Sequence, residues 1–188
     1  MGYRIARLAA LLACLAINVS ASVYELVENG AYEQPLSVGW EENIVGSSMY
    51  IQRLTTLDLD PDFEVRAYTN NGSGSASLSQ KLCLPSLDTV FSANLRSSAT
   101  DGNGAWCAAG MMISYLDAFS APLGRTFLGA RGAACPWEND DTFHIIRVGG
   151  TWETLNFVIV DELVDLPGVD PSQVAQLEVS LLVTASNC

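Results

Sequence analysis

Two tyrosines with polar neighbours are the first residues of this sequence that could do chemistry. Tyr50 and Tyr68 each lie in a segment that alternates apolar and polar residues. Gln52 lies two residues after Tyr50, and Arg66 lies two residues before Tyr68, so each shares a strand face with its tyrosine. Sugar rings present apolar C–H faces that stack on aromatic rings, and their hydroxyls bond to amide and guanidinium groups. These four residues are therefore candidate carbohydrate-binding residues.

Two tryptophans extend this candidate set. Trp106 follows the turn-rich segment 101–104, and Trp137 lies in the polar segment 135–141. A large ring beside polar groups on a loop can stack on a sugar, although large rings are more often packed in a core. We expect Trp137 to be the main sugar platform and Trp106 to assist it.

The sequence offers little for catalysis. Its one histidine, His144, lies among apolar neighbours and is expected to be a core or rim residue. No Gly-x-Ser-x-Gly elbow for a serine nucleophile is present. The sequence has 21 Asp and Glu residues, so carboxylate pairs of the kind a glycosidase needs arise by chance. We therefore expect no enzyme activity.

Charge restricts the partners. Nine Lys and Arg residues against 21 Asp and Glu give a formal net charge of -12 at pH 7. Such a surface repels nucleic acid and anionic membranes, and suits a neutral or weakly charged glycan.

The N-terminus has the layout of a secretory signal. Arg4 and Arg7 precede an apolar run over 8–19, and small residues follow at 20–21. This run is too short to span a bilayer, and no later stretch is longer, so no membrane span is expected. The sequence predicts a signal peptide over 1–21, one domain over 22–188, and a secreted, extracellular or periplasmic location.

Four cysteines remain after the expected signal peptide. An even number in an exported protein indicates two disulfides. Three pairings are possible, and we favour Cys107 with Cys135 and Cys83 with Cys188.

Alternation of apolar and polar residues dominates the rest of the chain, which predicts half-buried strands. Segment 106–116 is longer and nearly all apolar, which favours a strand covered on both faces over a buried helix. Turn signals separate the segments, among them 70–75 and Gly149-Gly150. The fold class is therefore all-β, a two-sheet antiparallel β-sandwich. Strands are expected at 48–54, 63–69, 76–84, 89–96, 106–116, 125–129, 143–148, 151–163 and 174–184.

Asn29-Gly30-Ala31-Tyr32-Glu33 is followed by Gly39-Trp40, and the runs 76–84, 152–163 and 179–181 come after them. The order of these motifs resembles galactose-binding-like jelly-roll domains, which are similar to carbohydrate-binding modules. The first motif and Gly39-Trp40 resemble the opening of those domains, with Tyr32 and Trp40 in the core. The resemblance implies a jelly roll that binds carbohydrate. It also implies a structural calcium ion, whose ligands would be Glu33, Asp161 and the backbone carbonyl of Asn29. Calcium prefers such oxygen ligands.

The sequence therefore predicts a secreted, non-catalytic, lectin-like module. One alternative is a structural subunit of an extracellular surface layer, filament or matrix, with self-association. A small secreted polysaccharide hydrolase or lyase is the third.

Overall fold

The structure, a computed structural model, describes residues 25–57, 62–102 and 105–186. The expected signal peptide over 1–21 and Cys188 lie outside the described residues. No helix within the described ranges is long and apolar enough to cross a membrane.

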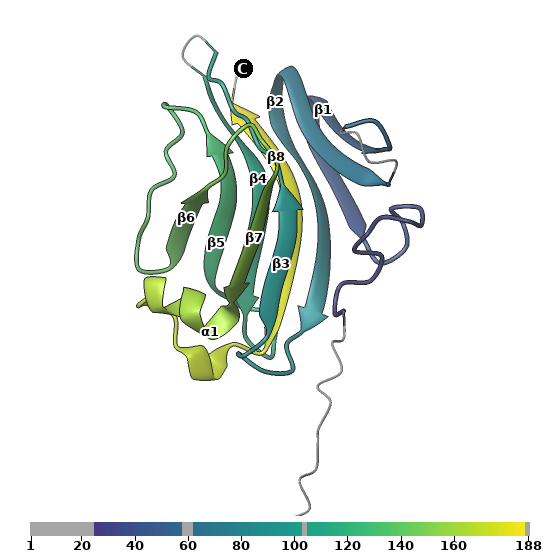
Figure 1. Ribbon diagram of the computed structural model, residues 1–188. Coiled ribbons are helices and arrows are strands. Elements are labelled where there is room, and N and C mark those ends of the chain that lie inside the picture. The colour runs from purple at the N-terminus through teal and green to yellow at the C-terminus, as the bar shows by residue number, and fades with distance from the viewer. Residues whose placement is uncertain (1–24, 58–61, 103–104, 187–188) are drawn as a thin grey trace, which may run out of the picture.

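Most strands belong to one large sheet. Its strand order is β1-β2-β8-β4-β5-β6 (Figure 1). The pairs are antiparallel except for β5 and β6, which run parallel. The bounds are β1 Glu41–Leu54, β2 Glu64–Cys83, β4 Trp106–Leu116, β5 Pro122–Arg131, β6 Phe143–Arg147 and β8 Gln176–Ser186.

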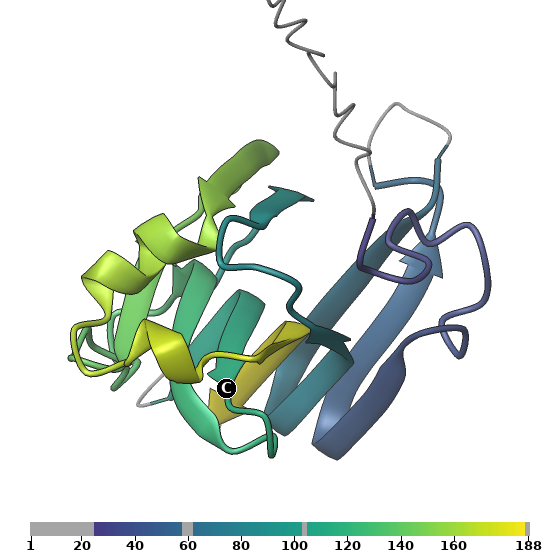
Figure 2. The same cartoon turned by 90° about the horizontal axis from the view of Figure 1, so that it is seen from below.

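A second, thinner layer covers one face of this sheet. It contains a two-stranded sheet of β3 (Val90–Leu95) and β7 (Glu153–Val158). The short helix α1 (Ile159–Glu162) and the 3-10 turn Leu163–Asp165 continue from β7 over the same face, as the view from below shows (Figure 2). A second 3-10 turn, Pro171–Gln173, precedes β8.

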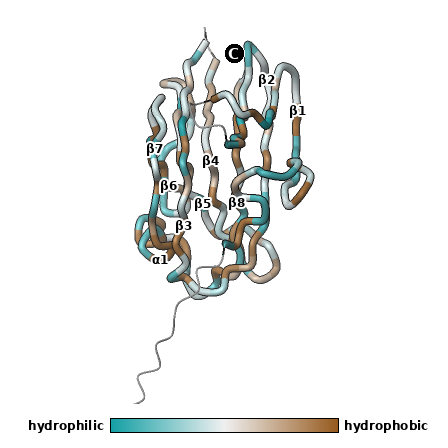
Figure 3. The backbone as a smooth tube through the Cα atoms, turned by 45° about the vertical axis from the view of Figure 1, so that its right-hand side comes forward, coloured by the Kyte–Doolittle hydropathy of each residue, from teal (hydrophilic) through white to brown (hydrophobic). Residues whose placement is uncertain are grey.

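The core lies between the two layers. Along β8 every second residue is buried, and its buried residues share a face with Ile113 and Tyr115 of β4. Leu95 from the small sheet and Ile159 from α1 close over them. Figure 3 shows hydrophobic and hydrophilic residues close together around α1, beside the sheet. Because this face is apolar on both layers, its burial holds α1 and β7 in place.

The hairpin of β1 and β2 folds back over the core face. Segment 70–75, expected as a hairpin tip, is instead part of β2. The pairing changes register between Ser47 and Met49, where three residues of β2 lie opposite one residue of β1. Beyond this bulge Met49 packs against Ala76 and Val183 of the large sheet. The outer half of the hairpin, 49–54 with 64–69, thus joins the second layer.

Three other expectations differ from the structure. The sandwich is not purely antiparallel, because the long connection 132–142 lets β6 return parallel to β5. Gly149-Gly150 is no hairpin turn, since β6 and β7 lie in different sheets. The expected strand over 151–163 ends at Val158, and α1 begins at Ile159. The β-rich class and the presence of two sheets are confirmed, and the sheets have six and two strands.

The expected Cys107–Cys135 disulfide is not formed. Cys107 packs with Met49 and Val183 on the core face, whereas Cys135 packs with Phe127 on the opposite face. Ala108, the residue after Cys107 in β4, belongs to the same cluster as Cys135, and neighbouring residues of a strand point to opposite faces. The sheet therefore lies between the two sulfurs. Cys83 is exposed and has a free thiol.

Candidate functional site

Tyr50, Tyr68, Gln52 and Arg66 come together as the alternation predicts. Tyr50 lies directly opposite Tyr68, and Gln52 opposite Arg66, in the outer half of the hairpin. The tyrosine rings stack with centroids 5.0 Å apart, and the Arg66 guanidinium lies 4.2 Å from the Tyr68 ring centroid. Met49 and Ile51 point to the core, so the alternate side chains point away from it. The four side chains of Tyr50, Gln52, Arg66 and Tyr68 thus form an outward-facing square. Tyr50 is 43 % exposed.

This square borders a large cleft. The cleft has a volume of about 1350 Å³. Arg66 and Tyr68 line it from the hairpin, and Arg96, directly after β3, and Trp152, directly before β7, line it beside the small sheet. The Arg96 guanidinium lies 5.2 Å from the Trp152 ring centroid, so each side of the cleft carries an arginine–aromatic pair.

Amide and hydroxyl groups accompany the second pair. Asn94 and Thr154 are exposed cross-strand partners on β3 and β7. The Thr154 hydroxyl donates to Asn94 Oδ1 at 2.7 Å, and both residues line the cleft. The Asn94 amide nitrogen, whose hydrogens this bond does not use, is a donor suited to a sugar hydroxyl.

Trp106 and Trp137 lie on the other face of the large sheet. Trp137 meets Phe127 and Phe143 edge-on, at 5.1 and 5.8 Å between centroids. Trp106 contacts Trp137 at 6.2 Å. The structure thus places Trp137 in a small aromatic cluster and does not bring it near Tyr50 and Tyr68.

Two of the three residues expected to bind calcium have backbone carbonyls that accept other hydrogen bonds. The Asn29 carbonyl accepts hydrogen bonds from Trp40 Nε1 and from the Tyr32 backbone N–H. The Glu33 carbonyl accepts from Arg53, and Asp161 is exposed on α1. The calcium site therefore stays a prediction from the resemblance.

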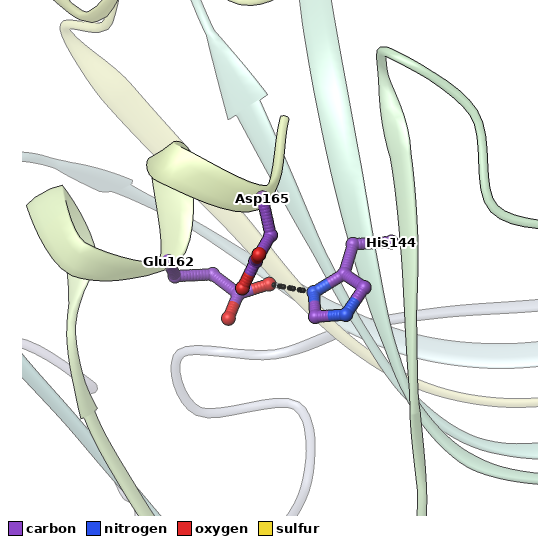
Figure 4. A group of neighbouring side chains, drawn as sticks. All are labelled: His144, Glu162 and Asp165. Atoms are coloured by element: carbon purple, nitrogen blue, oxygen red, sulfur yellow. Dashed lines mark hydrogen bonds and ion pairs between the residues drawn. The ribbon is translucent and has the colours of Figure 1, made fainter. Parts of the chain in front are cut away.

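His144 belongs to a hydrogen-bonded chain that crosses the core. Thr126 of β5 lies beside His144 of β6 in the parallel pairing, on the face that α1 covers. Glu162 Oε1 lies 2.6 Å from His144 Nδ1 (Figure 4). The same oxygen accepts a hydrogen bond from the Thr126 hydroxyl at 2.8 Å. The Tyr115 hydroxyl lies 3.1 Å from Thr126 Oγ1. Since Thr126 gives its one hydroxyl hydrogen to Glu162, Tyr115 is the donor in that contact.

Burial changes the pKa of Tyr115 in this series of hydrogen-bonded side chains. Tyr115 and Thr126 are fully buried, and the side chains of Glu162 and His144 are 5 % and 21 % exposed. Burial raises the pKa of Tyr115 well above its usual value, and the nearby Glu162 charge raises it further, against the lowering effect of the Thr126 hydrogen bond. Tyr115 therefore stays a neutral donor.

Sequence reasoning missed the carboxylates of this cluster. Glu162 and Asp165 fall where a strand end and a loop were expected. In those structures a spacing of three residues does not predict that two side chains lie on the same side. Read as a helical segment, that spacing places both carboxylates on one side.

Comparison with known proteins identifies no family. The chain matches no protein-family model and no curated protein. A similar solved structure is the enzymatically active domain of tailspike protein 4 from bacteriophage CBA120. The TM-score is 0.42 at 15% sequence identity, over 85% of this chain and 19% of that chain. The present chain thus spans about a fifth of that chain, and at this TM-score the likeness carries no argument about function.

Proposed function

We propose that this protein is an exported, non-catalytic carbohydrate-binding module whose glycan lies in the cleft between the outer hairpin and the small sheet. The observation that carries the proposal is the placement of two arginine–aromatic pairs, Arg66 with Tyr68 and Arg96 with Trp152, along one cleft. Aromatic rings supply stacking surfaces, and the guanidinium groups supply donors for sugar hydroxyls.

The geometry supports an extended ligand. The cleft is larger than a site for one sugar residue needs, since its volume exceeds that of ordinary small-molecule pockets. Tyr50 and Gln52 continue the polar and aromatic surface beside it. The cleft also contains Glu33 and Asp62, so its arginines do not make it uniformly cationic. A neutral or weakly charged oligosaccharide fits this mixed lining best.

Glycan-array screening followed by calorimetry tests the proposal. Tyr68→Ala and Trp152→Ala are each expected to weaken binding by about tenfold, which corresponds to roughly 1.4 kcal/mol. Phe119→Ala is the control, because Phe119 is a 92 % exposed aromatic on a turn outside the cleft. Incubation with the bound glycan, followed by product analysis, tests for turnover. Absence of any glycan binding by folded protein contradicts the proposal.

A specific feature favours the structural-subunit alternative. Strand β1 is an edge of the large sheet, and its Ile44 and Val45 are 43 % and 57 % exposed. An exposed apolar edge strand is a template for pairing with another chain. If the protein assembles, sedimentation should show concentration-dependent association that Ile44→Lys abolishes. A monomer at all concentrations would exclude this second function.

A further inference from the structure

His144, Glu162 and Asp165 form a group of potential metal ligands at one end of the molecule. Each offers one ligand atom, and these atoms lie within 4.8 Å of one another. His144 comes from β6, and the two carboxylates come from α1 and the turn that follows it. Figure 4 shows both carboxylates directed to the side of the helical segment that faces the imidazole.

The charges of this group call for a cation. Glu162 is a buried carboxylate, and a buried charge is costly unless it is paired. The only ion pair found for it among the described residues is with His144, which is a cation only when protonated. Asp165 adds a second carboxylate close by, and like charges at such a distance repel one another. A bound dication would compensate both.

The surroundings of Glu162 resemble the outer shell of a metal ligand. Thr126 donates to its carboxylate, and Tyr115 donates in turn to Thr126. Hydrogen bonds of this kind fix the orientation of ligating carboxylates in metal sites. Because Tyr115 and Thr126 are fully buried on the rigid large sheet, Glu162 is held before any ion arrives.

The donor set selects the kind of ion. One imidazole and two carboxylates suit first-row transition metals such as Zn²⁺, Mn²⁺ or Co²⁺. Calcium prefers six to eight oxygen ligands and is a poor match for an imidazole. Asp165 is exposed, so the remaining coordination positions face solvent.

We propose that His144, Glu162 and Asp165 together bind one divalent transition-metal ion, which joins β6 to the helical segment after β7. Each ligand binds in its deprotonated form, the imidazole through a nitrogen that carries no hydrogen. This site uses none of the cleft residues, so it stands independently of glycan binding.

Titration of chelator-treated protein with Co²⁺ and Zn²⁺ tests the proposal. The wild type is expected to bind one equivalent, and a visible Co²⁺ spectrum without a thiolate charge-transfer band would show nitrogen and oxygen ligation. Asp165→Asn should weaken binding by about tenfold or more. Asp161→Asn, an exposed acid on the same helical segment, should bind like the wild type.

The decisive variant is Asp165→Asn, because its side chain is exposed and the substitution preserves shape. His144→Gln is a second variant, which removes another of the proposed ligands. Circular dichroism checks that this variant folds. Absence of saturable binding, equal affinity in Asp165→Asn and wild type, or a thiolate band from Cys83 would each overturn the proposal. Binding of Ca²⁺ as tightly as Zn²⁺ would also overturn it, since the donor set predicts the opposite order.

Discussion

Gly46 lies directly opposite Gly74 at the point where the β1–β2 hairpin begins to fold back. Both have left-handed backbone angles, with φ of 101° and 137°. A Cβ on Gly46 would collide with the Ser73 carbonyl oxygen, and one on Gly74 with that of Val45. The pair therefore allows the two backbones to approach closely where the hairpin leaves the large sheet.

Replacing either glycine should weaken the fold. We expect Gly74→Ala to lower the free energy of unfolding by about 1–3 kcal/mol, because alanine rarely adopts this φ. Urea unfolding followed by tryptophan fluorescence measures the effect. Gly150→Ala is the matched control, since a Cβ there meets no atom within 4 Å, and it should change stability by no more than about 0.5 kcal/mol. Equal effects in both variants would contradict the role of the pair.

Thr126 links Tyr115 to Glu162, so its hydroxyl should contribute to stability. Thr126→Val leaves the Tyr115 hydroxyl without its acceptor and removes the Thr126 donor from Glu162, which keeps its contact with His144. We expect a loss of about 1–3 kcal/mol in chemical unfolding of metal-free protein. Thr154→Val, at an exposed position of β7, should cost much less. If Thr126→Val left the free energy of unfolding unchanged, water would have to replace the hydrogen bonds that Thr126 makes.

Asp140 should make the protein sensitive to acid. Hydrogen bonds from the Thr142 backbone N–H and the Thr142 hydroxyl lower the pKa of Asp140 from its ordinary value of 3.8. Because the folded-state pKa is the lower one, the stabilisation is present above pH 3.8 and is lost as the pH falls through the folded-state pKa.

Unfolding of Asp140→Asn at several pH values checks this effect. The variant should show a shallower loss of stability in acid than the wild type, while Asp141→Asn serves as the neighbouring exposed control. Carbon NMR of the Asp140 carboxyl should show titration below the ordinary range. If the stability of Asp140→Asn and of the wild type fell equally with decreasing pH, the hydrogen bonds from Thr142 to Asp140 would not form in solution.

The cysteines should differ in reactivity. Cys83 is exposed, whereas Cys135 is 5 % exposed within the aromatic cluster. Alkylation of native protein should therefore modify Cys83 first and reach Cys135 only after denaturation. Peptide mapping by mass spectrometry without reduction provides the readout. A peptide pair joined through Cys107 and Cys135 would contradict the separation of these residues by the large sheet.

Trp137 should matter for stability rather than for glycan binding. Its edge contacts with Phe127 and Phe143 hold the long connection 132–142 against the large sheet. We expect Trp137→Ala to cost about 2–4 kcal/mol, less than for a fully buried ring because Trp137 is partly exposed. Glycan affinity, measured where the variant remains folded, should not change. A selective loss of glycan binding with unchanged stability would reverse this assignment.

Several features were predictable because they depend on neighbours along the chain. Alternation placed Tyr50 with Gln52 and Tyr68 with Arg66, and the structure has each pair on one strand face. The long apolar segment 106–116 predicted a central strand, which β4 is. Trp40 is buried in the core as expected. Side chains two apart in a strand share a face whatever the fold around them, so these predictions needed no tertiary information.

The rest depended on contacts between residues far apart in the sequence. Local pattern could not show that the β1–β2 hairpin folds back, because Met49 turns inward to meet Val183. Nor could it show that 159–165 is helical, since α1 is too short to have a periodic signal.

By itself, then, the sequence determined the β-rich class and which side chains share a strand face. Only the tertiary structure decided that Trp137 packs away from the tyrosines and that His144 meets Glu162. Alternation is a property of the extended backbone, whereas those pairings arise from burial between layers, where long-range packing outweighs local preference.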